Sequence, residues 1–331
     1  MNNHPRRRNN ARKEAARAHQ AKYGGEYRDA ARAVTQTSRV PSFAEALGIT
    51  TRGFDPASVW RTHEHDSELQ IPVGYDEDGA VVTVGVPGLI FGLVAGGRGG
   101  LGKSTLLAAA AAALCLQYSP KRVNLLLADL DAFGQGTFAD LPTGLPHVLQ
   151  HWMRTPSADD PFEAGVSQIV DELGEVLRCE YQRRQDILAA YSVDSIGAYR
   201  QADLPPDAPV LPDLVAIIDA PVGRGVASSM FPPERIGSAE ARANLGIHVL
   251  SWLNPGDSGH CEENMRQLIG NIGYRVGLGR AAGSHHALVM RPASAALDVP
   301  DDGRWLAPPT VFNFARENAL IVKALRTIPT A

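Results

Sequence analysis

A glycine-rich run carries the residues with the clearest chemistry in this chain. Gly97 and Gly102 are separated by four residues, and Lys103 and Ser104 follow directly, which matches the pattern G-x-x-x-x-G-K-[ST]. The glycines allow a tight turn that points N–H groups at phosphate oxygens. The lysine supplies charge to the β- and γ-phosphates, and the serine hydroxyl is a Mg²⁺ ligand. The run therefore predicts a phosphate loop that binds ATP and Mg²⁺ through Gly97, Arg98, Gly99, Gly100, Leu101, Gly102, Lys103, Ser104 and Thr105.

Such a site also needs a carboxylate at the end of a neighbouring strand, where it holds Mg²⁺ through water. Asp219 follows an apolar run and is predicted to take this role. Many P-loop motors place a glutamate next, but Ala220 stands there, so we expect slow hydrolysis, because a positioned general base contributes about 10²- to 10⁴-fold in rate. Asp129 and Asp131 end another predicted strand and are the nearest replacements. The candidate catalytic residues are Lys103, Asp219 and Asp131, and the candidate metal ligands are Ser104, Asp219 and Asp129.

Short apolar strands that alternate with helices place these residues. The predicted strands are 89–95, 123–128, 214–218, 247–252 and 274–278, the predicted helices are 103–117 and 164–191, and a β-hairpin is predicted from 71–73 and 80–86 around the turn 76–79. Buried strands separated by helices predict an α/β fold with a mostly parallel sheet and helices on both faces. With the phosphate loop, this is the RecA-like architecture of P-loop NTPases.

Cysteine content and hydropathy indicate the cellular compartment in which we expect the protein. Cys115, Cys179 and Cys261 are far apart and form no C-x-x-C pair, so neither a disulfide framework nor a zinc ribbon is indicated. No secretory signal is visible, and no apolar run reaches the roughly 20 residues of a membrane-spanning helix. We therefore expect a cytoplasmic protein with no transmembrane segment of its own.

Charge is distributed unevenly along the chain. Residues 1–40 contain ten Lys/Arg and three Asp/Glu, although the whole chain has a net charge of -4. A basic arm on an acidic body favours contact with double-stranded DNA or another acidic partner, and a solvated tail is the alternative. We expect a basic N-terminal arm at 1–40 that is partly helical or disordered, a linker and leading β-hairpin at 41–85, and a P-loop ATPase domain at 86–331.

Several short motifs in a fixed order give the chain a resemblance to a known family. The motifs are IPVG (71–74), DEDG (76–79), SPKRVNLLL (119–127), EYQRRQDIL (180–188), LPDL (211–214), LGIHVL (245–250) and YRVGL (274–278). Together with the phosphate loop, they make residues 68–290 resemble the motor domain of the FtsK/SpoIIIE family, which includes the EccC ATPases of type VII secretion. The resemblance implies ATP binding, handling of DNA and a hexameric ring, in which Arg183 or Arg184 would meet a neighbouring subunit.

The chain departs from the family pattern around the expected catalytic groups. The Asp-Glu pair of the family is Asp219-Ala220, the lysine of the turn after Asp129 is absent, and the sensor glutamine after residues 245–250 is missing. These departures imply hydrolysis that is weak or that depends on a partner, such as another ATPase or a membrane complex.

A second resemblance, to ParA/MinD-type partition ATPases, rests on partly different residues. Residues 98–105 (RGGLGKST) are similar to their K-G-G-x-G-K-[ST] loop, 129–131 (DLD) to their D-x-D strand end, and 217–221 (IIDAP) to I-I-D-x-P. This alternative implies a dimer that forms on ATP, in which Asp131 positions water and Ala220 is normal. A third interpretation is a non-hydrolysing, nucleotide-bound scaffold of a secretion or conjugation complex.

Overall fold

The computed structural model describes residue 17 and residues 42–75, 80–86, 92–96, 102–130, 136–154, 162–221, 244–253, 274–281, 284–290, 310–311 and 314–330. Several of the sequence predictions therefore fall outside the described residues. These are the hairpin turn (76–79), the start of the first predicted strand (89–91), the first part of the phosphate loop (97–101), Asp131, and the basic arm apart from Arg17.

A single ten-stranded sheet organises the described chain, with the strand order β2-β1-β10-β9-β8-β3-β7-β6-β4-β5. Its parallel part is β8 (Tyr274–Ala281), β3 (Gly92–Gly96), β7 (Ile247–Leu253), β6 (Asp213–Pro221), β4 (Val123–Asp129) and β5 (Val148–Met153). Its antiparallel part is β9 (Ser284–Met290), β10 (Thr310–Val311), β1 (Gln70–Tyr75) and β2 (Val81–Gly85). The leading hairpin thus joins the same sheet as the strand before the phosphate loop.

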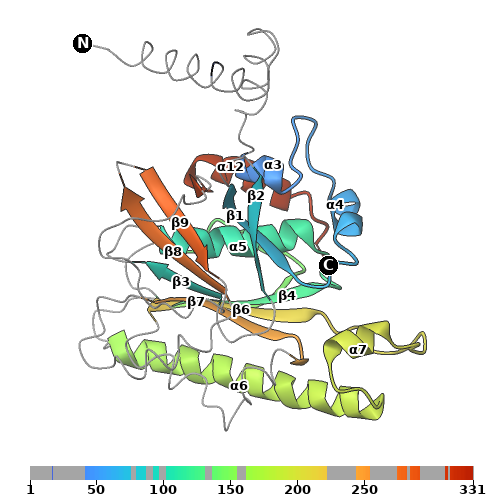
Figure 1. Cartoon of the computed structure of the whole chain (residues 1–331). Helices are drawn as coiled ribbons and strands as arrows, with labels where there is room; N and C mark the ends of the chain where they lie inside the picture. The colour runs from blue at the N-terminus through green and yellow to red at the C-terminus, as the bar shows by residue number, and fades with distance from the viewer. Residues whose placement is uncertain are drawn as a thin grey trace, which may run out of the picture.

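Helices cover both faces of this sheet (Figure 1). One face carries α5 (Lys103–Gln117), α12 (Phe314–Leu325), α3 (Phe43–Ala46) and α4 (Pro56–Thr62), and the other carries α6 (Phe162–Ala190) and α7 (Ile196–Gln201). The alternation along β4 shows the two layers, because Leu125 and Leu127 join the α5 core while Leu126 and Ala128 join the α6 core. Within the part of the chain that the structure describes, no helix combines the length and apolar character needed to cross a bilayer.

The first and last described helices are tied to each other. Ser42 and Glu45 form a capping box, with the Glu45 N–H donating to Ser42 Oγ at 3.2 Å and the Ser42 N–H donating to Glu45 Oε2 at 3.0 Å. Glu317 of α12 then accepts from the Ala44 N–H at 2.6 Å. This contact joins residues that are 273 positions apart and ties α3 to α12, which packs against α5.

The predicted α/β fold is confirmed, and the helix predicted at 103–117 has those bounds in the structure. Strand β5 and helix α12 were not predicted. Strand β5 lies at the sheet edge and contains an irregularity opposite Leu125 and Leu126, so its residues do not alternate regularly between buried and exposed. We keep the division at residues 40 and 85 as a proposal, in which the segment 42–86 contributes to the core around α5.

A buried ionic cluster lies where β6 and β7 begin, at the end of the parallel strands that is opposite the predicted site. The Asp213 carboxylate accepts from Arg122, from Arg200 at 3.0 Å and from His248 Nε2 at 3.0 Å. Arg184 lies beside it and donates to the carbonyl oxygens of Leu245 at 2.7 Å, Gly246 at 3.2 Å and Pro212 at 2.7 Å.

This arrangement corrects the expectation that Arg184 would meet a neighbouring subunit. Its side chain is only 2% exposed, and it donates to Glu180 and to the carbonyl oxygens of Leu245, Gly246 and Pro212. The arginine side chain is long enough to reach from α6 to the start of two strands, so the E-x-x-R-R motif holds the helix to the sheet. Arg183 is the exposed member of the pair.

Two buried histidines give the fold a predicted pH dependence. Burial lowers the pKa of His147 from 6.5 to about 4, although its Nε2 donates to the Tyr118 carbonyl oxygen at 2.8 Å. Burial, helped by the charges of Arg184, Arg200 and Arg122, lowers the pKa of His248 from 6.5 to about 3. Below about pH 6.5 these histidines are therefore protonated in the unfolded chain but stay neutral in the folded chain. As the pH is lowered, the free energy of unfolding decreases by up to about 1.4 kcal/mol per pH unit for each histidine.

We expect the free energy of unfolding to be lower at about pH 5 than at about pH 7.5, and this difference to shrink in His147→Phe. Urea unfolding followed by circular dichroism at the two pH values measures it. His65→Gln, an exposed histidine, is the matched control and should keep the full difference. Equal pH slopes for the unaltered chain and His147→Phe would contradict the assignment of one proton to His147.

Candidate functional site

The N-terminus of α5 presents the second half of the predicted phosphate loop. Gly102 precedes the helix with φ of 90° and ψ of 21°, the left-handed region that glycine adopts without steric cost. Among the described residues no side chain caps the helix, and its first N–H groups point outward from its N-terminus. Lys103 is only 8% exposed at the first helical position, followed by Ser104 and Thr105. This end of α5 can hold an anionic group.

Asp219 lies on β6 beside the end of β4. Its residue is 0% exposed, it is the register partner of Asp129, and the Leu130 N–H donates to its carbonyl oxygen at 3.2 Å. The Thr137 hydroxyl donates to its Oδ2. Ala220 follows within the same strand. The two carboxylates predicted from sequence are thus neighbours at the edge where the parallel strands end.

Asp129 is surrounded by hydrogen-bond donors. Its Oδ1 accepts from the Thr137 N–H at 2.7 Å, and its Oδ2 accepts from the Phe138 N–H at 3.3 Å and from His151 Nε2 at 3.2 Å. Three donors on one buried carboxylate fix its orientation. The Asp129 side chain therefore anchors the turn that follows β4.

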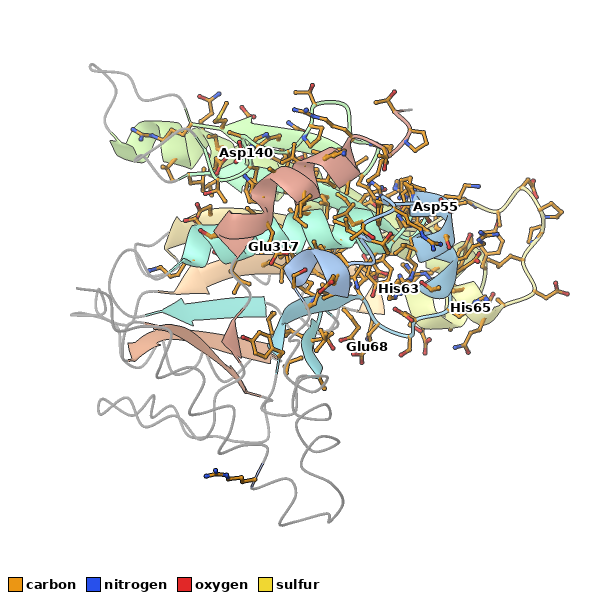
Figure 2. The ribbon with its side chains drawn as sticks, turned by 90° about the horizontal axis from the view of Figure 1, so that it is seen from above. Asp55, His63, His65, Glu68, Asp140 and Glu317 are labelled. Atoms are coloured by element: carbon orange, nitrogen blue, oxygen red, sulfur yellow. The ribbon has the colours of Figure 1, made fainter. Side chains whose placement is uncertain are left out.

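A cavity of about 310 Å³ opens beside the start of α5, between this helix, α12 and the segment 136–141. Its polar lining includes Ser104, Thr105, Thr137, Asp140 and Asn318. Asn318 Nδ2 donates to Asp140 Oδ2 at 2.6 Å, and Figure 2 shows Asp140 and Glu317 in the region of α12. Thr137, Asp140 and Asn318 were not among the site residues predicted from sequence.

The residues present fit a nucleotide with a hard divalent cation. Ser104 supplies a hydroxyl oxygen and Asp219 a carboxylate oxygen, and Mg²⁺ prefers oxygen ligands. Among the described residues, no group of three or more His, Cys, Asp or Glu could hold a metal ion. A cation bound here would therefore complete its shell with phosphate and water oxygens, as Mg²⁺ commonly does.

Fold and site together define the class of protein. A strand, a segment ending in Gly-Lys-Ser and a helix, set in a parallel sheet with a buried aspartate two strands away, are the architecture of P-loop NTPases. A family model described as "FtsK/SpoIIIE family" matches residues 57–296. The chain belongs to the FtsK/SpoIIIE family.

Similar proteins with curated descriptions are ESX secretion system proteins. The chain is 29% identical over 247 residues to the ESX-4 secretion system protein EccC4 of Mycobacterium tuberculosis, covering 72% of this chain and 19% of that protein. It is 28% identical over 236 residues to the ESX secretion system protein EccC of Thermomonospora curvata, covering 68% and 16%. This chain thus spans less than a fifth of either protein.

A solved structure shares the fold. The cytoplasmic domain of the Thermomonospora curvata type VII secretion ATPase EccC superposes with a TM-score of 0.63 at 22% sequence identity, covering 89% of this chain and 35% of that one. The family match decides between the two sequence resemblances in favour of FtsK/SpoIIIE over ParA/MinD.

Proposed function

We propose that the chain binds ATP with Mg²⁺ as a module of a secretion-type complex, and that it hydrolyses ATP weakly or only with a partner. The observation that carries the proposal is the placement of Gly102, Lys103 and Ser104 at the start of α5 in an FtsK/SpoIIIE-family fold with Asp219 buried on β6. In this proposal the glycine-rich loop 97–102 and Thr105 contact the phosphates, and Lys103 faces the β- and γ-phosphates. Ser104 and Asp219 serve Mg²⁺.

Weak hydrolysis is proposed from the residue that follows Asp219. Alanine has no group to polarise water, so Ala220 leaves the position of the general base empty. Asp131 stays the candidate to orient water in its place. Asp129, proposed from sequence as a second metal ligand, is held by three donors and fits better as an anchor for the turn at 136–138.

The secretion role is proposed from the relatives, whose names describe ESX secretion system proteins. The family resemblance supports the further proposal that it acts together with a partner ATPase or a membrane complex. A homo-oligomer, a hexamer in the manner implied by the family, and a cytoplasmic location belong to the same proposal.

DNA handling is the second candidate function. It is favoured by the ten Lys/Arg against three Asp/Glu in residues 1–40, whereas the names of the relatives mention secretion and not DNA. Contacts to DNA phosphates would make such binding strongly dependent on salt.

The test is equilibrium binding of ATP to the full chain with and without Mg²⁺, together with steady-state hydrolysis with and without double-stranded DNA. We expect binding that is tighter with Mg²⁺, and turnover that is slow and unchanged by DNA. A chain that does not bind ATP would refute the proposal. Turnover that DNA stimulates in a salt-sensitive way would instead support DNA handling.

A further inference from the structure

The turn at residues 136–138 is hydrogen-bonded to both carboxylates, Asp129 and Asp219, near the C-terminal ends of β4 and β6. Its backbone N–H groups at Thr137 and Phe138 donate to Asp129, at 2.7 and 3.3 Å, and the Thr137 hydroxyl donates to Asp219. One residue therefore bonds to Asp129 through its backbone and to Asp219 through its side chain. Asp129 and Asp219 themselves are register partners on β4 and β6.

Local packing fixes this turn in one conformation. Gly136 has φ of +89°, and a Cβ atom there would lie 2.9 Å from Asp129 Oδ2 and 3.1 Å from Met153 Sδ. Only glycine fits, because both the backbone angle and the space exclude a side chain. On the other side of Thr137, Phe138 is buried and packs edge-on against His151 at 5.9 Å between ring centroids. His151 in turn bonds to Asp129.

We propose that Thr137 is a positioning residue for Asp219, and that it sets this carboxylate for the cation that accompanies ATP. The inference rests on the proposed function, since it assumes that Asp219 helps to bind Mg²⁺. It assigns different roles to the two aspartates: Asp219 faces the cation, while Asp129 holds the turn that carries Thr137.

The chemistry of a hydroxyl group suits this role. A threonine hydroxyl has one hydrogen to donate and two lone pairs, so while it donates to Asp219 its oxygen can still accept from water in the site. Thr137 also lines the cavity that Ser104 lines, so it bonds to one proposed cation-binding group and shares a cavity with the other. A carboxylate that is already oriented loses less conformational freedom when the cation arrives.

The test measures ATP affinity as a function of Mg²⁺ concentration, using ATP with a fluorescent ribose label as the probe. Thr137→Val removes the hydroxyl at nearly constant shape, and Thr137→Ser restores it. We expect Thr137→Val to raise the Mg²⁺ concentration at half effect about fivefold, since one hydrogen bond to a charged group is lost. Affinity in the presence of EDTA should stay the same, and Thr137→Ser should behave as the unaltered chain.

Two further variants keep the test decisive. Thr137→Ala lacks the hydroxyl without the added methyl group of valine, and it should shift the Mg²⁺ dependence in the same direction if valine disturbs folding. Asp219→Asn weakens the proposed cation ligand directly and should shift the dependence further. Thermal unfolding monitored by circular dichroism confirms that each variant is folded.

The pattern of results separates this inference from the proposed function. An unchanged Mg²⁺ dependence in Thr137→Val and Thr137→Ala, beside a shifted one in Asp219→Asn, would overturn the role of Thr137 and leave the proposed function standing. Failure of the unaltered chain to bind the labelled ATP would overturn both. Equal losses of affinity with Mg²⁺ and with EDTA would show a structural role for Thr137 and would also overturn the inference.

Discussion

Replacing Lys103 by alanine is expected to weaken ATP binding by at least about 10²-fold, because it removes a charged donor from the phosphates at the cost of nearly 3 kcal/mol. Lys103 is the first residue of α5 and is only 8% exposed. The helix dipole and the loop N–H groups remain in the variant, but they cannot supply a full positive charge. Titration with labelled ATP in the presence of Mg²⁺ measures the loss.

The matched control for this substitution is Lys121→Ala. Lys121 is an exposed lysine just before β4, at the end of the parallel strands that is opposite the site. Its replacement by alanine changes the net charge of the chain by the same amount as Lys103→Ala. It should leave ATP affinity unchanged within about twofold, less than 0.5 kcal/mol. Equal ATP affinities for Lys103→Ala and Lys121→Ala would show that the phosphate loop does not bind ATP.

The predictability of this site from sequence differs between its two halves. Lys103, Ser104 and Asp219 belong to contiguous patterns, a glycine-rich loop before a helix and an aspartate after an apolar strand, so local sequence predicts them. Thr137 and Asp140 are brought to the site by a turn whose shape depends on Asp129, His151 and the packing of Phe138. Such long-range contacts leave no periodic signal in the sequence.

The same contrast holds for the fold. Helix α5 and strand β4 are buried along their lengths, and their apolar runs predict both elements with nearly the right ends. Helix α12 lies about 200 residues further along the chain and is held by α5 and α3, through the bond from the Ala44 N–H to Glu317. Its place beside the candidate site is set by tertiary packing, which no local propensity encodes.

The neighbouring arginines of α6 show how burial separates two side chains that the sequence presents as equals. Both donate to Glu180, Arg183 Nε to Oε2 and Arg184 Nε to Oε1, each at 2.6 Å. The side chain of Arg183 is 49% exposed and that of Arg184 is 2% exposed. Only Arg184 reaches the carbonyl oxygens of Pro212, Leu245 and Gly246, where β6 and β7 begin.

Arg184→Ala is therefore expected to lower the free energy of unfolding by about 3–5 kcal/mol, the cost of breaking a buried charged network. Arg183→Ala should cost less than about 1 kcal/mol, because an exposed ion pair contributes little in water. Urea unfolding followed by circular dichroism compares the two, and the shared partner Glu180 cancels from the comparison. Arg184→Lys should not rescue stability, since a single ammonium group cannot bridge carbonyl oxygens on both strands as the planar guanidinium does. Similar losses for the two alanine variants would show that Glu180, and not the strand carbonyls, is what Arg184 stabilises.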